Sequence, residues 1–160
     1  MTVLCAAQGI LLAGLLIYGS IHDIRTHTMP DWVWMGVAAT AFLTFRLSSL
    51  PSICNTPQAY CSEIVHGTIS GLLGAAAVLL IEVPMAILHG ERAMGGADIK
   101  LSAAGAFLLG WRKGLFALIL GLTLSLIVVP IVRKIRHEDN RKAFALVPFL
   151  AVGIMTAYLI

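Results

Sequence analysis

The stretch Met94-Gly95-Gly96-Ala97-Asp98-Ile99-Lys100-Leu101 joins three small residues to the start of a hydrophobic segment. It places the carboxylate of Asp98 where a helix is predicted to enter a bilayer. A charge in that position is unfavourable, so we interpret Asp98 first as a functional residue. A second carboxylate, Asp23, ends another hydrophobic segment in Ile21-His22-Asp23-Ile24-Arg25. Function therefore depends on whether the path of the chain brings Asp23 and Asp98 together.

The composition indicates a membrane protein. Of the 160 residues, 59% are hydrophobic and 12% are charged, and the mean hydropathy is +0.92. Soluble domains average about 25% charged residues, so the bilayer is the expected solvent. The length suits one domain, residues 1–160, without a soluble appendage. The net charge of +3 does not indicate nucleic-acid binding, because the basic residues fall in short loops, where they are typical of membrane topology.

Six segments approach the length and apolarity of a membrane span, which takes about 20 mostly apolar residues. They are residues 3–22, 32–50, 64–88, 95–111, 114–132 and 143–160. The second segment carries Arg46, and the fourth is short unless it includes Gly95 and Gly96. We expect an all-α integral membrane protein with six transmembrane helices in one bundle.

Basic residues in alternate loops predict the orientation of these helices. With the N-terminus outside, the inner loops and their edges hold Arg25, Arg92, Lys100, Arg133, Lys134, Arg136, Arg141 and Lys142, and the outer loops hold Arg46, Arg112 and Lys113. This bias predicts that both termini are outside. Asp23 and Asp98 then face the cytoplasm, and span length places Asp98 about 9 Å below that surface.

Two carboxylates that share a site cannot easily both ionise, so one keeps a proton and the pair titrates as a unit. Aspartic proteolysis requires this state, because the ionised group activates water while the protonated group donates to the scissile carbonyl. The small residues Gly95, Gly96 and Ala97 would let an extended peptide approach closely. Proton or ion transport, a catalytically inactive scaffold, and two unrelated aspartates at the membrane surface are the alternatives.

Three further charged residues lie near the two aspartates in the predicted topology. Glu82 is at a depth similar to that of Asp98, where it could modulate the pair, act in a transport relay, or simply bond to neighbouring helices. Lys100 and Arg25 are each two residues from an aspartate, and residues two apart do not face each other on a helix. We therefore expect Lys100 to anchor the helix end at the headgroups rather than to pair with Asp98.

The three cysteines form no Cys-x-x-Cys pair, which argues against a zinc ribbon or a thioredoxin-type site. We expect no metal and no organic cofactor. Cys54 and Cys61 lie in a predicted outer loop, where a disulfide bond can form. Two free thiols are the alternative, and Cys5 is a competing partner.

Three stretches together resemble the type IV prepilin peptidases, which are membrane aspartic proteases with a Gly-x-Gly-Asp motif. The first, Asp23-Ile24-Arg25-Thr26-His27-Thr28-Met29-Pro30-Asp31-Trp32, is similar to the family's aspartate, basic run, Ile-Pro and polar residue opening the next helix. The second is Met94–Leu101 with Ala103-Ala104-Gly105, and the third is Phe144–Ala151, which contains a Pro-Phe pair. The resemblance covers nearly the whole chain.

The resemblance implies that Asp23 and Asp98 are the catalytic pair. It places the following residues in the supporting motifs: Gly95, Gly96, Ala97, Lys100, Pro30 and Pro148. It also implies a prepilin-like substrate with a basic leader and a hydrophobic helix. Cleavage would follow a glycine at the cytoplasmic face of a bacterial or archaeal membrane, before assembly into a pilus.

The sequence departs from the family pattern at three points. Ala97 stands where the motif has its second glycine, and alanine does not tolerate positive φ as glycine does. Met29 replaces the usual Ile before Pro30. Longer members carry an N-terminal cytoplasmic cysteine-rich domain and methylate the new N-terminus. Because that domain has no counterpart here, we expect the short form of tight-adherence pilus systems or archaeal preflagellin processing, without methyltransferase activity.

Overall fold

The computed structural model describes residues 2–26, 28–48, 57–89, 95–136 and 145–160, which form helices and short connections without strands. The helices are α1 (Thr2–Thr26), α2 (Asp31–Ser48), α4 (Pro57–His89), α5 (Gly96–Arg136) and α6 (Val147–Leu159). The all-helical prediction is confirmed for this part of the chain. Several boundaries differ from the predicted segments; for example, α1 continues to Thr26, α4 begins at Pro57 and α5 continues to Arg136. Hydropathy marks the apolar part of a span, whereas a helix can continue into the headgroup region.

The helix α5 reverses its direction at Gly110, so that it consists of two arms. Gly110 has φ 77° and ψ 173°, a conformation that is essentially restricted to glycine. A Cβ atom on Gly114 would lie 2.8 Å from the Cα atom of Ala106. In a straight helix, residues eight apart are separated by about 12 Å. The arms 96–109 and 111–136 therefore fold back on one another, as the separate predicted segments 95–111 and 114–132 require.

Three of the described helices contain stretches long and apolar enough to cross a membrane. These stretches are Ala6–Thr26, Ser62–Leu88 and Gly96–Val132, and Val147–Leu159 is a shorter apolar helix. The third stretch contains the reversal at Gly110. Large hydrophobic side chains such as Ile10, Leu80 and Leu126 are mostly exposed on the surface of the bundle. An apolar surface of this extent is typical of a protein that faces lipid.

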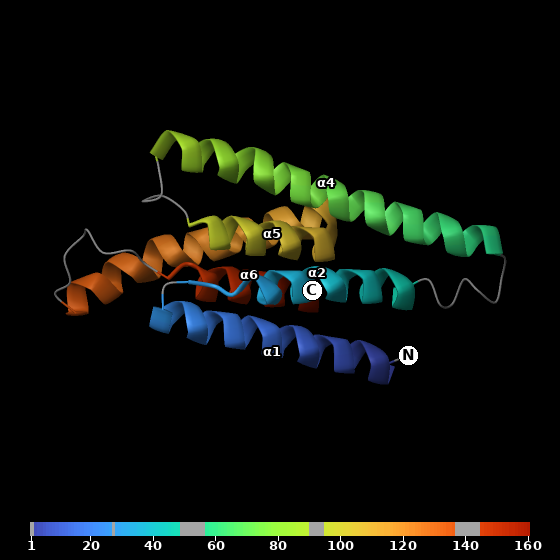
Figure 1. The fold of residues 1–160 in the computed structure, drawn as a ribbon, viewed down its shortest axis with the longest axis horizontal. Coiled ribbons are helices and arrows are strands. Elements are labelled where there is room, and N and C mark those ends of the chain that lie inside the picture. Colours follow the sequence, from blue (N-terminus) through green and yellow to red (C-terminus); the bar gives the residue numbers. More distant parts are fainter. Residues whose placement is uncertain (1, 27, 49–56, 90–94, 137–144) are drawn as a thin grey trace.

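Figure 1 shows the helices side by side, with the N-terminus toward one end; α6 runs toward that end and stops near the middle of the view, where the C-terminus lies. The opposite end collects the last turns of α1 and α4 and the first turns of α2, α6 and the first arm of α5. α5 packs against α2, α4 and α6, whereas α1 packs against α2 and α6. The end of the bundle opposite the N-terminus therefore brings together segments that are distant in the sequence.

Small residues allow these helices to approach closely. A Cβ atom on Gly74 of α4 would lie 2.7 Å from the carbonyl oxygen of Ala106, and one on Gly153 of α6 would lie 2.3 Å from that of Ala117. Small residues at helix contacts are typical of membrane bundles, where packing and hydrogen bonds replace the hydrophobic effect. Fully buried side chains come from every described helix: Leu12, Val33, Val78, Leu101 and Leu150.

Candidate functional site

Asp98 lies in the first turn of α5, and its side chain helps to form that turn. The backbone N–H groups of Asp98 and Ile99 donate to the carbonyl oxygen of Gly95 at 3.1 Å and 3.3 Å. The N–H of Gly95 donates in return to Asp98 Oδ2 at 3.1 Å. This reciprocal pattern caps the helix and places a carboxylate at its N-terminus, where the helix dipole favours negative charge. Local backbone chemistry therefore fixes the position of Asp98.

The small residues before Asp98 are in different environments. Ala97 is helical and half-buried, and α5 departs from helical angles at Gly110 alone, so the alanine in the motif requires no positive φ. A Cβ atom on Gly95 would lie 3.2 Å from Asp98 Oδ2, whereas one on Gly96 would contact nothing within 4 Å. Gly95 is therefore the residue whose small size leaves room for the carboxylate.

Asp23 lies in the last turn of α1, and this turn lies at the same end of the bundle as the first turn of α5 (Figure 1). Both side chains are buried, with 6% of Asp23 and 8% of Asp98 exposed. The charge of Asp23 acts on the Asp98 carboxyl group, so the two groups lie within electrostatic range. The helices that carry them are connected by α2 and α6, which pack against both α1 and α5. The fold thus brings the two aspartates into one site.

Glu82 of α4 joins this site from the other side of α5. It is 2% exposed, and Ser102 Oγ donates a hydrogen bond to its Oε2 atom. Its charge also interacts with that of Asp98. Ser102 was not among the residues selected from the sequence. It lies one helical turn after Asp98, so it shares a face with the aspartate, which is the spacing that could have identified it.

Lys100 points to the outside of the bundle and bonds to Asp31. Its Nζ atom donates to Asp31 Oδ1 at 2.7 Å, and Nε1 of Trp34 donates to the same oxygen at 3.0 Å. The hydrogen bond from Lys100 lowers the pKa of Asp31. We predicted that Lys100 would anchor the helix end at the headgroups rather than pair with Asp98. Its carboxylate partner in the structure is Asp31, and this bond connects the first turns of α2 and α5. The anchoring at the headgroups stays a prediction.

The other residues selected from the sequence lie near the site or outside the described part of the chain. Arg25 is exposed on the last turn of α1. The carbonyl oxygen of Pro30 accepts a hydrogen bond from the backbone of Val33 at 3.1 Å, and Pro148 lies in the first turn of α6. Cys54 and the side chain of Cys61 are outside the described residues, so their disulfide bond stays a prediction.

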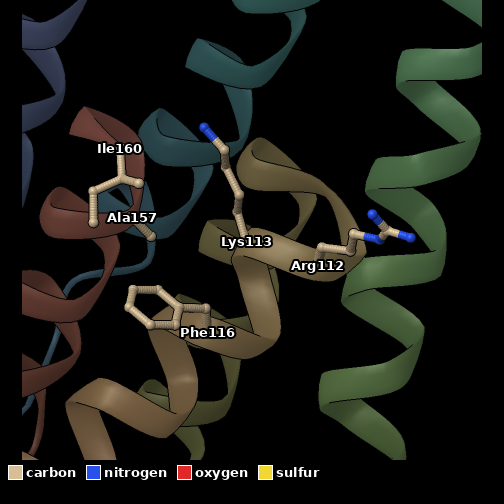
Figure 2. A pocket seen from close by; sticks show the side chains of 5 residues that line it. All are labelled: Arg112, Lys113, Phe116, Ala157 and Ile160. Atoms are coloured by element: carbon tan, nitrogen blue, oxygen red, sulfur yellow. The ribbon is translucent and has the colours of Figure 1, made fainter.

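A pocket at the opposite end of the bundle is chemically different from this site. Figure 2 shows its lining residues, which are Arg112, Lys113, Phe116, Ala157 and Ile160. They come from α5 just after its reversal and from the end of α6. This lining contains no carboxylate side chain. Among the described residues, the buried acidic side chains are Asp23, Glu82 and Asp98.

Comparison with known proteins adds independent information. The model of the type IV leader peptidase family matches residues 10–130, which include all three buried carboxylates. A prepilin leader peptidase/N-methyltransferase from Pectobacterium carotovorum subsp. carotovorum is 34% identical over 150 residues. The match covers 90% of this chain and 47% of that relative, so the chain spans about half of its length. No solved structure matches the chain.

Proposed function

Since the chain belongs to the type IV leader peptidase family, we propose that it is a membrane-embedded aspartic endopeptidase with Asp23 and Asp98 as its catalytic pair. The observation that carries this proposal is the meeting of two buried carboxylates from helices that are distant in the sequence, α1 and α5. We infer that the substrate is a prepilin-like precursor with a basic leader and a hydrophobic helix. This inference is supported by the 34% identity to the prepilin leader peptidase.

The proposed reaction uses water as the nucleophile. One carboxylate of the pair is ionised and takes a proton from water, while the other is protonated and donates to the carbonyl oxygen of the scissile peptide. The hydrogen bond from the Gly95 N–H holds one oxygen of Asp98, so that the carboxylate has a fixed orientation. A fixed orientation favours general acid–base catalysis, because proton transfer depends on the geometry of donor and acceptor.

We further propose that the chain crosses the membrane six times, with both termini outside and the site facing the cytoplasm. The two arms of α5 would each be one crossing. This topology is supported by the position of the N-terminus and the direction of α6 in Figure 1 and by the basic residues of the alternate loops. The first arm, residues 96–109, measures about 21 Å, whereas the hydrocarbon core is about 30 Å thick. If this arm reaches the outer side of the membrane, its first turn begins inside the hydrocarbon core on the cytoplasmic side. Asp98, in that first turn, would therefore lie below the cytoplasmic surface.

The test is cleavage of a pilin-like precursor in membranes that contain wild type, Asp23→Asn or Asp98→Asn. Each variant keeps the size of the side chain but cannot exchange the required proton, so we expect its rate to fall by about 10²- to 10⁴-fold. Asp31→Asn is the matched control, because Asp31 is an exposed aspartate at the same end of the bundle. We expect this control to cleave within about two-fold of wild type. Retained cleavage by either Asp23→Asn or Asp98→Asn would exclude the proposed mechanism.

A further inference from the structure

Glu82 is a buried acidic residue that the two-aspartate mechanism does not use. It lies in α4 and is less exposed than either aspartate. Its Oε2 atom accepts a hydrogen bond from Ser102, whereas its Oε1 atom has no hydrogen-bond partner among the described residues. A buried carboxyl group with an unsatisfied oxygen is unfavourable for stability.

The hydrogen bond to Ser102 fixes the position of Glu82 relative to Asp98. Asp98 and Ser102 are four residues apart in α5, so their side chains lie one above the other on one face. A carboxyl group bonded to Ser102 is thus about one helical turn from Asp98. The electrostatic interaction of Glu82 with Asp98 agrees with this placement.

The described charged groups around Glu82 do not include a cation that pairs with it. α4 packs against α5 and α2. From α5, Asp98 interacts with Glu82, while Lys100 is exposed and bonds to Asp31 of α2. Beyond Asp98 lies Asp23 of α1, whose charge acts on Asp98 in turn. Three carboxyl groups therefore form a chain of electrostatic interactions, in which Asp98 is the middle member.

We propose that Glu82 is a positioning residue that acts electrostatically on the catalytic pair, held in place by Ser102. This proposal rests on the proposed function, because it concerns the ionisation of Asp23 and Asp98. Interacting carboxyl groups titrate as a set, and a neighbouring negative charge makes the loss of a shared proton less favourable. In its ionised form, Glu82 would thus extend the active range of the pair toward higher pH.

The test is the pH dependence of cleavage between about pH 5 and pH 9 for wild type and Glu82 variants. In Glu82→Gln, which removes the charge but keeps the size, we expect the alkaline limb to move to lower pH by about one unit. Glu82→Met removes the charge without a hydrogen-bonding group, and we expect the same displacement. Glu82→Asp keeps the charge, so its profile should stay near that of wild type. Glu63→Gln is the matched control, since Glu63 is an exposed glutamate on the same helix.

A profile of Glu82→Gln or Glu82→Met that coincides with wild type would overturn the electrostatic role. Equal loss of rate at every pH would also overturn it, because that result describes a structural bond to Ser102 alone. If Glu82→Gln does not accumulate in membranes, Glu82→Met decides the question. The proposed function is tested separately. Inactive Asp98→Asn with an unmoved Glu82→Gln profile would refute the role of Glu82 and leave the protease assignment intact.

Discussion

Replacement of Gly95 by alanine should disturb the site through a single atom. The new Cβ atom would lie 3.2 Å from Asp98 Oδ2, which is closer than ordinary contact. The carboxylate must then move by about 0.2 Å, since contacts of this kind normally begin near 3.4 Å. A displacement of about 1 Å from reactive geometry can lower a rate by about 10²-fold. By proportion in free energy, we expect the kcat of Gly95→Ala to fall by about 2.5-fold.

Gly96 provides the matched control at the next position. A Cβ atom on Gly96 would contact nothing within 4 Å, and this residue is exposed in the first turn of α5. Alanine is the better helix former by about 1 kcal/mol in a helix interior, so Gly96→Ala should keep its activity and its stability.

The assay is the initial rate of precursor cleavage in detergent or proteoliposomes, together with the thermal unfolding of each purified variant. We expect Gly95→Ala to lose rate while it unfolds near the temperature of wild type, because its backbone is not held at a positive φ. The reasoning is refuted if Gly95→Ala cleaves at the wild-type rate. It is also refuted if Gly96→Ala loses as much rate as Gly95→Ala.

Two further predictions concern stability. Gly110→Ala should lower the free energy of unfolding by about 1–3 kcal/mol, because alanine is strained at φ 77° and its Cβ atom would lie 2.7 Å from Ser70 Oγ. The double variant Gly110→Ala with Ser70→Ala removes this close contact. In thermal unfolding, it should therefore recover part of the lost stability. Lys100→Met removes the group that lowers the pKa of Asp31. A carboxylate whose pKa is lowered on folding stabilises the folded state only above its ordinary pKa of about 4, and this contribution is lost at acid pH. We therefore expect Lys100→Met to unfold at a lower temperature than wild type only above about pH 4. The difference in unfolding temperature should become smaller in high salt.

The sequence alone was sufficient to locate the helices and the main acidic residues. Hydropathy identified the apolar segments, because the requirement for about 20 apolar residues is a property of each segment by itself. Loop charges and span parity predicted that Asp23 and Asp98 lie at one end of the bundle, and the arrangement in Figure 1 agrees. The alanine of the motif was a concern at the level of sequence. It is resolved by the observation that Ala97 is helical, because the glycine that needs a positive φ is Gly110.

The partners of the site residues could not be predicted from the sequence. Ser102 bonds to Glu82, and Lys100 bonds to Asp31, although the members of each pair belong to different helices. Such pairs depend on the rotation of one helix against another. That rotation is set by close contacts of small residues, such as Gly74 with Ala106, which hydropathy does not report.

The sequence by itself therefore indicated the solvent, the helical class and the candidate acid–base residues. These properties follow from composition and from spacing along one segment. The tertiary structure alone decided that Asp23, Asp98 and Glu82 interact, that Asp98 is the middle member, and that α5 reverses at Gly110. The physical reason is that burial and electrostatic interaction depend on distances between helices, and these distances are fixed only when the bundle packs.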